Sequence, residues 1–353
     1  MRYTKKSRGN KLKKRHINIP IFIPHKGCPH TCIFCDQRRI SGFTTLQTPE
    51  KIEEIIKESL DTIEDSNNIE IAFFGGSFTG IPEKEMISFL QVAKSFVDNK
   101  KVHGIRLSTR PDYINPHIMD ILGEYGVTAI ELGVQSLDPD VLIASKRGHT
   151  VKDTIKSCNL IKERKISLGI QTMLGLPEDN FSKAVETAKS VVDLMPDMVR
   201  IYPALVLKNT ELETLYNEGK FSPLTVEEAV LWCSEIVQIY KSASIKILRI
   251  GLHSSEILEG SIVAGPYHPA FGELVESQIL LKRIIKDLNI LKLNRKITER
   301  SSIIIKTRPN LLSKVIGQNR SNISEIKEKF GINKIRIVSD IETKEFGIQI
   351  TEC

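Results

Sequence analysis

The chain has 353 residues, enough for one large hydrophobic core and a small accessory domain. Its hydrophobic content of 41% is ordinary for a globular protein, and no apolar run approaches the roughly 20 residues that a membrane-spanning helix needs, so we expect no membrane span. The net charge of +7 is unevenly spread: residues 1–16 hold eight Lys or Arg and no acid, and residues 282–336 hold fifteen against four acids. Two basic ends around an acidic body indicate either a polyanionic partner or a solvated tail and helix face.

The first residues are basic and lead into a short apolar run without a small-residue cleavage site. This pattern is not typical of a secretory signal, and it predicts a cytoplasmic protein. Clustered thiols in the cytosol bind metal or carry redox chemistry more often than they form structural disulfides.

Strands and helices alternate over residues 16–205. We predict strands at 16–24, 69–76, 104–110, 128–136, 166–175 and 197–205, with helices at 49–63, 82–98, 115–125, 150–164 and 180–194. Such βα alternation demands right-handed crossovers and a parallel sheet. The pattern therefore predicts an α/β fold, either a doubly wound sheet or a complete or partial barrel, with ligands at the carboxyl ends of the strands.

The rest of the chain divides into an extension and a compact end. Helices are predicted near 210–218, 225–241 and 272–288, with a strand at 244–252, and the large body ends at about residue 295. The final stretch has the pattern β, helix, helix, β, β and its own apolar spacing. We expect a basic tail at 1–16, a large domain at 17–295 with an extension from about 206, and a small α/β domain at 296–353.

Three cysteines lie within eight residues, directly after the first predicted strand. Cys28, Cys32 and Cys35 can place three thiolates around one inorganic centre, because soft sulfur ligands select iron-sulfur clusters or zinc. A structural zinc site needs a fourth ligand, and the nearest candidates are His25 and His30. His30 lies between two of the cysteines, which makes simultaneous ligation awkward, and the Glu partner of the zinc deaminases is missing. The spacing favours a four-iron cluster with one iron left open.

The spacing Cys28-x3-Cys32-x2-Cys35, with Phe34 immediately before the third cysteine, resembles the signature of the radical S-adenosylmethionine (radical SAM) superfamily. The resemblance implies a partial (β/α)6 parallel-strand barrel, a 4Fe-4S cluster on the three catalytic cysteines, and SAM on the open iron. It also implies that an electron from the reduced cluster cleaves SAM to a 5'-deoxyadenosyl radical. An electron donor such as flavodoxin or ferredoxin is then expected.

Further motifs resemble the SAM-contacting segments of that superfamily. "FFGGSF" (73–78) is similar to its glycine motif, and "ELGVQS" (131–136) is similar to the segment that faces the SAM ribose. Glu131 lies in an otherwise apolar strand, where burial without a partner is costly, which favours ligand contact. Arg147 suits the SAM carboxylate, although surface or helix-cap chemistry explains it equally well. The residues implied for SAM are Phe34, Gly75, Gly76, Ser77, Glu131, Gln135, Arg147 and Gln171.

Six motifs in order narrow the resemblance over roughly residues 15–290. "FFGGSFTGIP", "STRPD", "ELGVQSLD", "RGHT", "GLPED" and "IYPALVLKNTELETLYNEGKF" together resemble the radical SAM half of the Elongator catalytic subunit and its bacterial relatives. The resemblance implies a radical modification at C5 of the wobble uridine of tRNA. That family carries an acetyltransferase domain after the radical domain. This sequence shows no room for it and no matching acyl-CoA loop, so we do not expect acetyl-CoA as co-substrate on this basis.

The segment "VIGQNRSNISEIKEKFGINKIRI" (315–337) resembles a KH domain, which binds single-stranded nucleic acid at a GxxG loop between two helices. The loop here ends in Arg320 instead of glycine, and this arginine either adds a phosphate contact or blocks one. A small α/β domain kept for packing or protein contact is the alternative. The residues implied for RNA binding are Lys314, Gly317, Gln318, Asn319, Arg320, Lys327, Lys334 and Arg336.

These observations predict a radical SAM enzyme, a tRNA-modifying transferase whose partner is RNA. One alternative is a radical SAM enzyme on a small molecule, similar to oxygen-independent coproporphyrinogen oxidase, although the basic tail and the KH-like end argue against it. The other is an RNA-binding protein with a structural or redox-sensing cluster, which leaves "FFGGSF" and "ELGVQS" unexplained. Cys158 and Cys233 lie beside apolar residues and are predicted to pack in the core.

Overall fold

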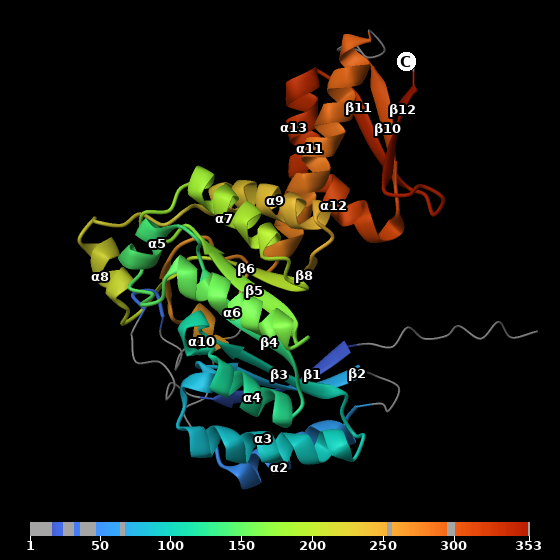
Figure 1. Cartoon of the computed structure of the whole chain (residues 1–353). Helices are drawn as coiled ribbons and strands as arrows, with labels where there is room; N and C mark the ends of the chain where they lie inside the picture. The colour runs from blue at the N-terminus through green and yellow to red at the C-terminus, as the bar shows by residue number, and fades with distance from the viewer. Residues whose placement is uncertain are drawn as a thin grey trace, which may run out of the picture. The chain divides into compact units, whose positions relative to one another are not determined.

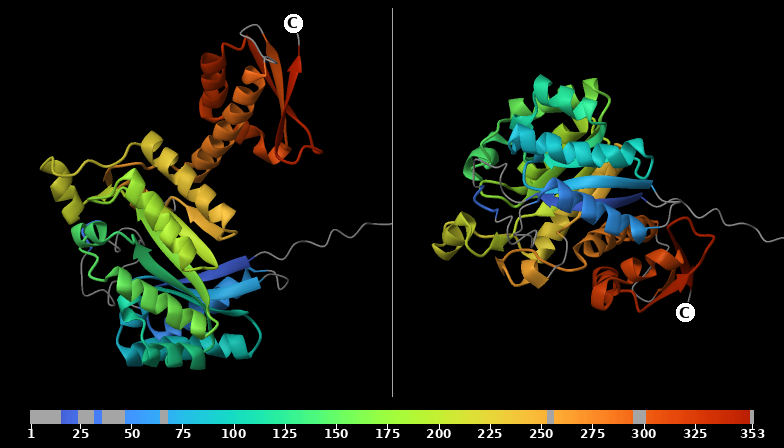
Figure 2. Two further views of the ribbon diagram at one scale, coloured as in Figure 1. Left: turned by 45° about the horizontal axis from the view of Figure 1, so that its top comes forward. Right: turned by 90° about the horizontal axis from the view of Figure 1, so that it is seen from below.

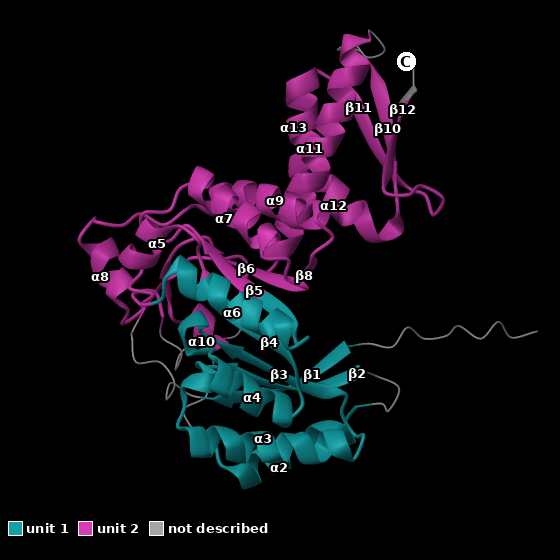
Figure 3. Ribbon diagram, in the orientation of Figure 1, with its two compact units in different colours: residues 1–31, 37–134, 149–169 teal, residues 32–36, 135–148, 170–353 magenta. Residues whose placement is uncertain are grey.

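The computed structural model describes residues 16–23, 32–35, 47–63, 68–252, 256–294 and 301–351. The chain divides into two compact units (Figure 3). The first comprises residues 1–31, 37–134 and 149–169, and the second comprises residues 32–36, 135–148 and 170–353. Within the described ranges, no helix has the length and apolar character to cross a bilayer.

Seven strands form one sheet, and their order in the sheet is their order in the chain (Figure 1). They are β1 (His16–Ile23), β2 (Asn68–Gly75), β3 (Gly104–Thr109), β4 (Val127–Gln135), β5 (Ser167–Leu174), β6 (Met198–Pro203) and β8 (Lys246–Ile250). The pairs β1–β2, β2–β3, β3–β4 and β6–β8 are parallel. A doubly wound sheet reverses its order at a switch point, so the unbroken order selects the barrel type. The six predicted βα strands are present, and β8 adds a seventh.

In the first unit, the strands have one apolar face and one face that carries charged residues. The apolar side chains Ile21, Ile71 and Leu107 are fully buried, whereas Glu70 and Arg106 alternate with them on the opposite face. The unit's helices are α2 (Pro49–Asp61), α3 (Glu83–Asp98), α4 (Pro116–Glu124) and α6 (Val151–Glu163). Helix α2 begins where the sequence predicts, because the Thr48 side chain accepts a hydrogen bond from the Lys51 amide.

The second unit contains β5 from residue 170 onward, β6, β8 and the short antiparallel pair β7 (Val206–Leu207) and β9 (Ile262–Ala264). Its helices before the C-terminal module are α5 (Pro139–Ala144), α7 (Phe181–Asp193), α8 (Glu211–Asn217), α9 (Val226–Ser242) and α10 (Glu256–Glu259). Helix α5 was not predicted, because its six residues are too few for a helical period to be seen.

Cys158 in α6 and Cys233 in α9 are fully buried, as predicted, and burial raises the pKa of the Cys158 thiol to about 12.

The C-terminal module is a small α/β unit, as expected. It consists of α11 (Phe271–Leu293), β10 (Ser302–Thr307), α12 (Leu312–Ile316), α13 (Ser321–Phe330), β11 (Lys334–Ser339) and β12 (Phe346–Thr351). The central strand β10 is parallel to β11 and antiparallel to β12. Both views place α11 and α13 on one side of these strands (Figures 1 and 2). Ile284 and Leu288 of α11 share a core with Ile303 and Ile305, so the module's core includes residues before the predicted boundary at 296.

Candidate functional site

Two of the three predicted cluster ligands fall within the described residues. Cys28 lies outside them, and Cys32 and Cys35 lie in the segment 32–35 of the second unit. The Cys35 amide donates to the Cys32 carbonyl at 3.0 Å, so the two thiols belong to one tight turn. Cys32 is buried and Cys35 is half-buried. With Cys28 outside the described ranges, those ranges contain no group of three potential metal ligands.

The segment between the two cysteines is anchored through Ile33. Its amide donates to the Ser145 carbonyl at 3.3 Å, and its carbonyl accepts from the Leu212 amide at 2.8 Å. The Ile33 side chain is 1% exposed and packs with Val206 and Leu212. Phe34 packs at the edge of this cluster and of a second one. These contacts fix the cysteine turn within the second unit and give Phe34 a packing role. The contact of Phe34 with SAM stays a prediction.

Arg147 contacts the sulfur of Cys32. Its Nη1 donates to Cys32 Sγ at 3.2 Å, and each residue is only 7% exposed. The backbone on either side of Arg147 is left-handed, with φ 49° at Lys146 and 78° at Gly148, so the chain reverses sharply after α5 and turns this side chain toward the cysteine segment. A cationic donor beside a sulfur offsets negative charge on it. The predicted pairing of Arg147 with the SAM carboxylate is untested.

The glycine motif lies in the first unit, where β2 ends. Gly75 has φ 102°, and a Cβ atom there would lie 2.8 Å from the Ile23 carbonyl oxygen of β1. The Gly76 amide donates to the same oxygen at 2.9 Å. Ser77 is buried and precedes a short 3₁₀ helix, Phe78–Gly80. Close approach of two backbones therefore requires glycine at position 75, and the predicted contacts of the motif with SAM remain to be tested.

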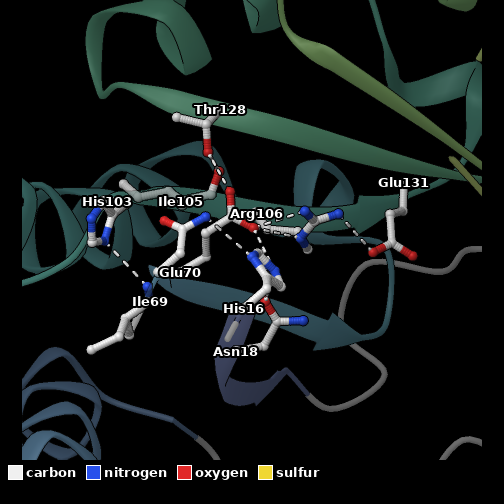
Figure 4. A network of polar contacts seen from close by, with 10 residues as sticks. His16, Asn18, Ile69, Glu70, His103, Ile105, Arg106, Thr128 and Glu131 are labelled. Atoms are coloured by element: carbon white, nitrogen blue, oxygen red, sulfur yellow. Dashed lines mark hydrogen bonds and ion pairs between the residues drawn. The ribbon is translucent and has the colours of Figure 1, made fainter. Parts of the chain in front are cut away.

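Glu131 belongs to a network of polar contacts on β1, β2, β3 and β4, in which Glu70, Arg106 and Glu131 are buried (Figure 4). Arg106 donates from Nη1 to Glu131 Oε1 at 3.2 Å and from Nε and Nη2 to Glu70 Oε2 at 2.9 and 2.7 Å. Thr128 Oγ1 donates to Glu70 Oε1 at 3.0 Å, and His16 Nε2 lies 3.2 Å from Glu70 Oε2. Every carboxylate of the network thus has a partner.

This network removes the reason for expecting a ligand at Glu131. The side chain is 1% exposed, but Arg106, itself 5% exposed, supplies the missing positive charge. The sequence alone does not reveal the pair, because it depends on the register that sets Arg106 opposite Ala129, two residues before Glu131 on the same face. The ion pair with Arg106 accounts for the burial of Glu131 without SAM, and the contact of Glu131 with SAM stays a prediction.

The end of β4 carries an unusual backbone conformation. Gln135 has φ 67°, in the left-handed region that non-glycine residues rarely occupy, and is 9% exposed. Ser136, next to it, accepts from the Asp138 amide at 3.0 Å and lies 3.3 Å from Thr187 Oγ1. Such strained positions gather at ligand sites, which agrees with the prediction for Gln135. Gln171 is half-buried in β5, within the same unit.

Asp179 organises the loop after β5, and sequence reasoning gave it no role. Its two carboxylate oxygens accept hydrogen bonds from the Gly175 amide at 2.8 Å and the Asn180 amide at 2.9 Å. Burial raises the pKa of Asp179 to about 6, and the charge of Asp138 adds to this effect. The motif "GLPED" therefore includes a carboxyl group that holds a strand-end loop.

The predicted GxxG-like loop lies between α12 and α13. Gly317 has φ 77°, and a Cβ atom there would lie 2.6 Å from Ser321 Oγ and 2.8 Å from the Asn322 amide nitrogen. Asn319 and Arg320 are also left-handed, with φ 51° and 63°, and their side chains are exposed. The helix–loop–helix arrangement expected from the sequence is therefore present, with glycine required at the first loop position.

The other predicted RNA-binding residues are distributed over three places. Lys314 forms an ion pair with Glu276 of α11. Lys327 is exposed on α13, and Lys334 and Arg336 are exposed on β11. The predicted set is therefore not one surface: the loop, the α11 contact, helix α13 and strand β11 each hold part of it.

Two family models match this chain. The Radical SAM superfamily model matches residues 22–191, and the Radical_SAM C-terminal domain model matches residues 196–280. The first match includes the cysteine turn, the glycine motif and strands β2 to β5. The chain belongs to the radical SAM superfamily, whose cofactors are a 4Fe-4S cluster and SAM.

The comparisons also find Elongator-type relatives. A tRNA uridine(34) acetyltransferase of Methanocaldococcus infernus is 31% identical over 250 residues, which are 65% of this chain and 45% of that protein. The human Elongator complex protein 3 is 29% identical over 217 residues, 55% of this chain and 38% of the relative. The chain thus spans less than half the length of these relatives.

A solved structure confirms the fold class. The archaeal Elp3 of Methanocaldococcus infernus, with an N-terminal deletion (1-46), superimposes with a TM-score of 0.61 at 25% identity, over 77% of this chain and 64% of that one. The fold is accordingly a partial parallel βα barrel with a small C-terminal α/β module.

The described residues fit the cofactors of the superfamily. Cys32 and Cys35 offer two thiols on one turn, the soft donors that an iron-sulfur cluster needs. Arg147 adds a cationic hydrogen-bond donor at one of these sulfurs. The group at this position would therefore be a negatively charged, sulfur-ligated centre.

Proposed function

We propose that this radical SAM enzyme modifies tRNA, with a wobble uridine as the target. The observation that carries the proposal is the 31% identity over 250 residues to a tRNA uridine(34) acetyltransferase, a match that extends over 65% of this chain. The helix–loop–helix of the C-terminal module, with its exposed Arg320, provides separate support for an RNA substrate.

Within this proposal, Cys28, Cys32 and Cys35 hold the cluster. When bound, the cluster and SAM supply a 5'-deoxyadenosyl radical for attack on the substrate. Gly75 to Ser77 and Gln135 lie at the carboxyl ends of β2 and β4, where the βα fold places ligands, so we assign them to SAM binding with Gln171. Cys32 is only 7% exposed, so little water reaches this thiol.

The proposed reaction is a radical modification of RNA and does not include acetyl transfer. Acetyl transfer belongs to relatives of which this chain spans less than half, so we do not carry that step over. A flavodoxin or ferredoxin as electron donor and a cytoplasmic location complete the proposal as predictions.

The test is an anaerobic assay of the full chain. The cluster is reconstituted, SAM, dithionite and total tRNA from cells lacking this activity are added, and 5'-deoxyadenosine and nucleoside masses are followed together. We expect deoxyadenosine to rise with tRNA and one uridine to change mass. For the cluster variant Cys32→Ala, Cys158→Ala serves as the matched control, because it removes a buried thiol outside the predicted cluster. Deoxyadenosine without any altered nucleoside contradicts the RNA substrate, and this outcome favours a small molecule instead.

A further inference from the structure

The sheet of the C-terminal module has two different faces. Its register sets Ile304 of β10 beside Arg336 of β11 and Gln349 of β12, so these three side chains point to the same side. The opposite side, with Ile303 and Ile305, packs against the helices. Figures 1 and 2 show α11 and α13 on that side alone. We call the side away from the helices the outer face; its described positions are Ser302, Ile304, Lys306, Lys334, Arg336, Val338, Gly347 and Gln349.

The charge of the outer face is entirely positive. Lys306, Lys334 and Arg336 lie on it, and none of its eight positions is acidic. Lys334, Arg336 and Gln349 are exposed, and Lys306 is half-buried. Asp340, beyond the end of β11, interacts with Lys306 electrostatically, whereas Lys334 and Arg336 lie at exposed positions of strand β11. The three cations therefore lie on one sheet surface, with the half-buried Ile304 among them.

The α13 and loop region of the module is closer to neutral charge than the outer face. On α13, the exposed Lys327 and Lys329 are balanced by the exposed Glu325 and Glu328. Lys314 is already paired with Glu276 of α11, which leaves Arg320 as the excess cation of the loop region. Phosphate binding depends on Lys and Arg charges that a counter-ion on the protein does not already neutralise. The electrostatics thus favour the outer face over the GxxG-like loop as the main site of phosphate contact.

We propose that the outer face of the C-terminal sheet binds the phosphate backbone of the RNA substrate. This inference rests on the proposed function and specifies which residues contact the RNA. Lys306, Lys334 and Arg336 provide most of the electrostatic affinity for RNA, and the GxxG-like loop provides less. Alternate residues of a strand lie about 6.6 Å apart on one face, so Lys334 and Arg336 present a row of cations along β11. The chemistry recognised is the polyanionic backbone, which gives affinity without base specificity.

Two triple variants of the full chain with equal loss of charge test this inference. The outer-face variant is Lys306→Gln, Lys334→Gln, Arg336→Gln, and the loop variant is Arg320→Gln, Lys327→Gln, Lys329→Gln. Binding of fluorescein-labelled total tRNA is measured by anisotropy between 50 and 300 mM KCl. We expect the outer-face variant to bind about tenfold more weakly at 100 mM salt, with the slope of log K against log salt reduced by about 2. The loop variant should change affinity less than about threefold.

The outcomes separate the two proposals. If the wild-type chain binds no tRNA, the proposed function itself fails. If the wild type binds and the loop variant loses the affinity, or if both variants weaken equally, the outer-face inference is overturned. The charge-preserving variant Lys306→Arg, Lys334→Arg should retain wild-type binding. The single variant Lys334→Gln, at an exposed position, keeps the test decisive if the triple variant does not fold.

Discussion

At the scale of single residues, Arg147 and Cys32 form the contact that bears most directly on the predicted cluster. The guanidinium lies 3.2 Å from the sulfur at a position where both side chains are buried. Hydrogen bonds and positive charge at the ligating sulfurs of an iron-sulfur cluster favour its reduced, more negative state. Arg147 is therefore expected to act through Cys32 as a positioning residue.

Replacing Arg147 by Gln should lower the midpoint potential of the reconstituted cluster, because the variant loses the positive charge at Cys32. Arg147→Lys should retain part of the effect. The potential is measured by EPR-monitored redox titration, and iron content and apoprotein melting serve as controls. An unchanged potential together with weaker SAM binding would mean that Arg147 binds the SAM carboxylate instead.

A second residue-scale prediction concerns Arg106. Replacing it by Ala leaves Glu70 and Glu131 buried without their shared cation, and breaking a buried pair in this way costs about 3–5 kcal/mol of the free energy of unfolding. Urea unfolding of the apoprotein measures the loss. Lys152→Ala, at an exposed position of α6, is the control and should change stability by less than about 0.5 kcal/mol. Equal effects of the two substitutions would contradict a structural role for the network.

At the scale of elements, the strand ends determine where ligands can bind, and their loops carry the local strain. Gly75→Ala places a methyl group 2.8 Å from a backbone oxygen of β1 at a φ of 102°, so we expect it to destabilise the protein by about 2 kcal/mol. Gly123→Ala in α4 has no neighbour within 4 Å and should stabilise by up to about 1 kcal/mol. Thermal melting of both variants checks the prediction. An unchanged melting temperature of Gly75→Ala would show that the β1 backbone shifts to accommodate the methyl group.

The loop held by Asp179 should make stability depend on pH. The pKa of Asp179 is raised to about 6, so the folded protein binds a proton more tightly than the unfolded chain. Stability from this group is therefore present near pH 4 and is lost as the pH rises to about 6. Asp179→Asn should remove this dependence. The measurement is the difference in melting temperature between wild type and variant at pH 4.5 and pH 7, and an identical difference at both pH values would refute the burial effect.

At the scale of the whole molecule, radical chemistry and RNA binding are predicted to reside in different parts of the chain. Cys32 lies in the barrel part of the second unit, whereas the basic sheet face belongs to the C-terminal module. Cys32→Ala should abolish SAM cleavage and leave the dissociation constant for tRNA within about twofold of wild type. Anaerobic deoxyadenosine assays and anisotropy titrations measure the two properties separately. Loss of both properties together would indicate that the cluster also supports the RNA site.

Much of the fold could be predicted, because it depends on local patterns. The helical and strand periods located the six βα strands and the helix–loop–helix of the C-terminal module to within a few residues. Helix α5 is too short for its period to be seen, and the use of α11 in the C-terminal core depends on packing between distant segments. Domain bounds drawn from composition cannot reveal that a helix before the boundary contributes to the core of the next domain.

The amino-acid sequence by itself determined the superfamily, through three cysteines at fixed spacing, and the parallel architecture, through the alternation of two periods. Only the tertiary structure decided which partner each buried charge has. Arg106 meets Glu131 because of strand register, and Arg147 meets Cys32 because the chain reverses after α5. Three cations share one sheet face because the register of β10 on β11 sets Lys306 opposite Val338, on the same side as Lys334 and Arg336. Local periods are set by the geometry of neighbouring residues, whereas these pairings bring together residues far apart in the chain, and no local pattern encodes them.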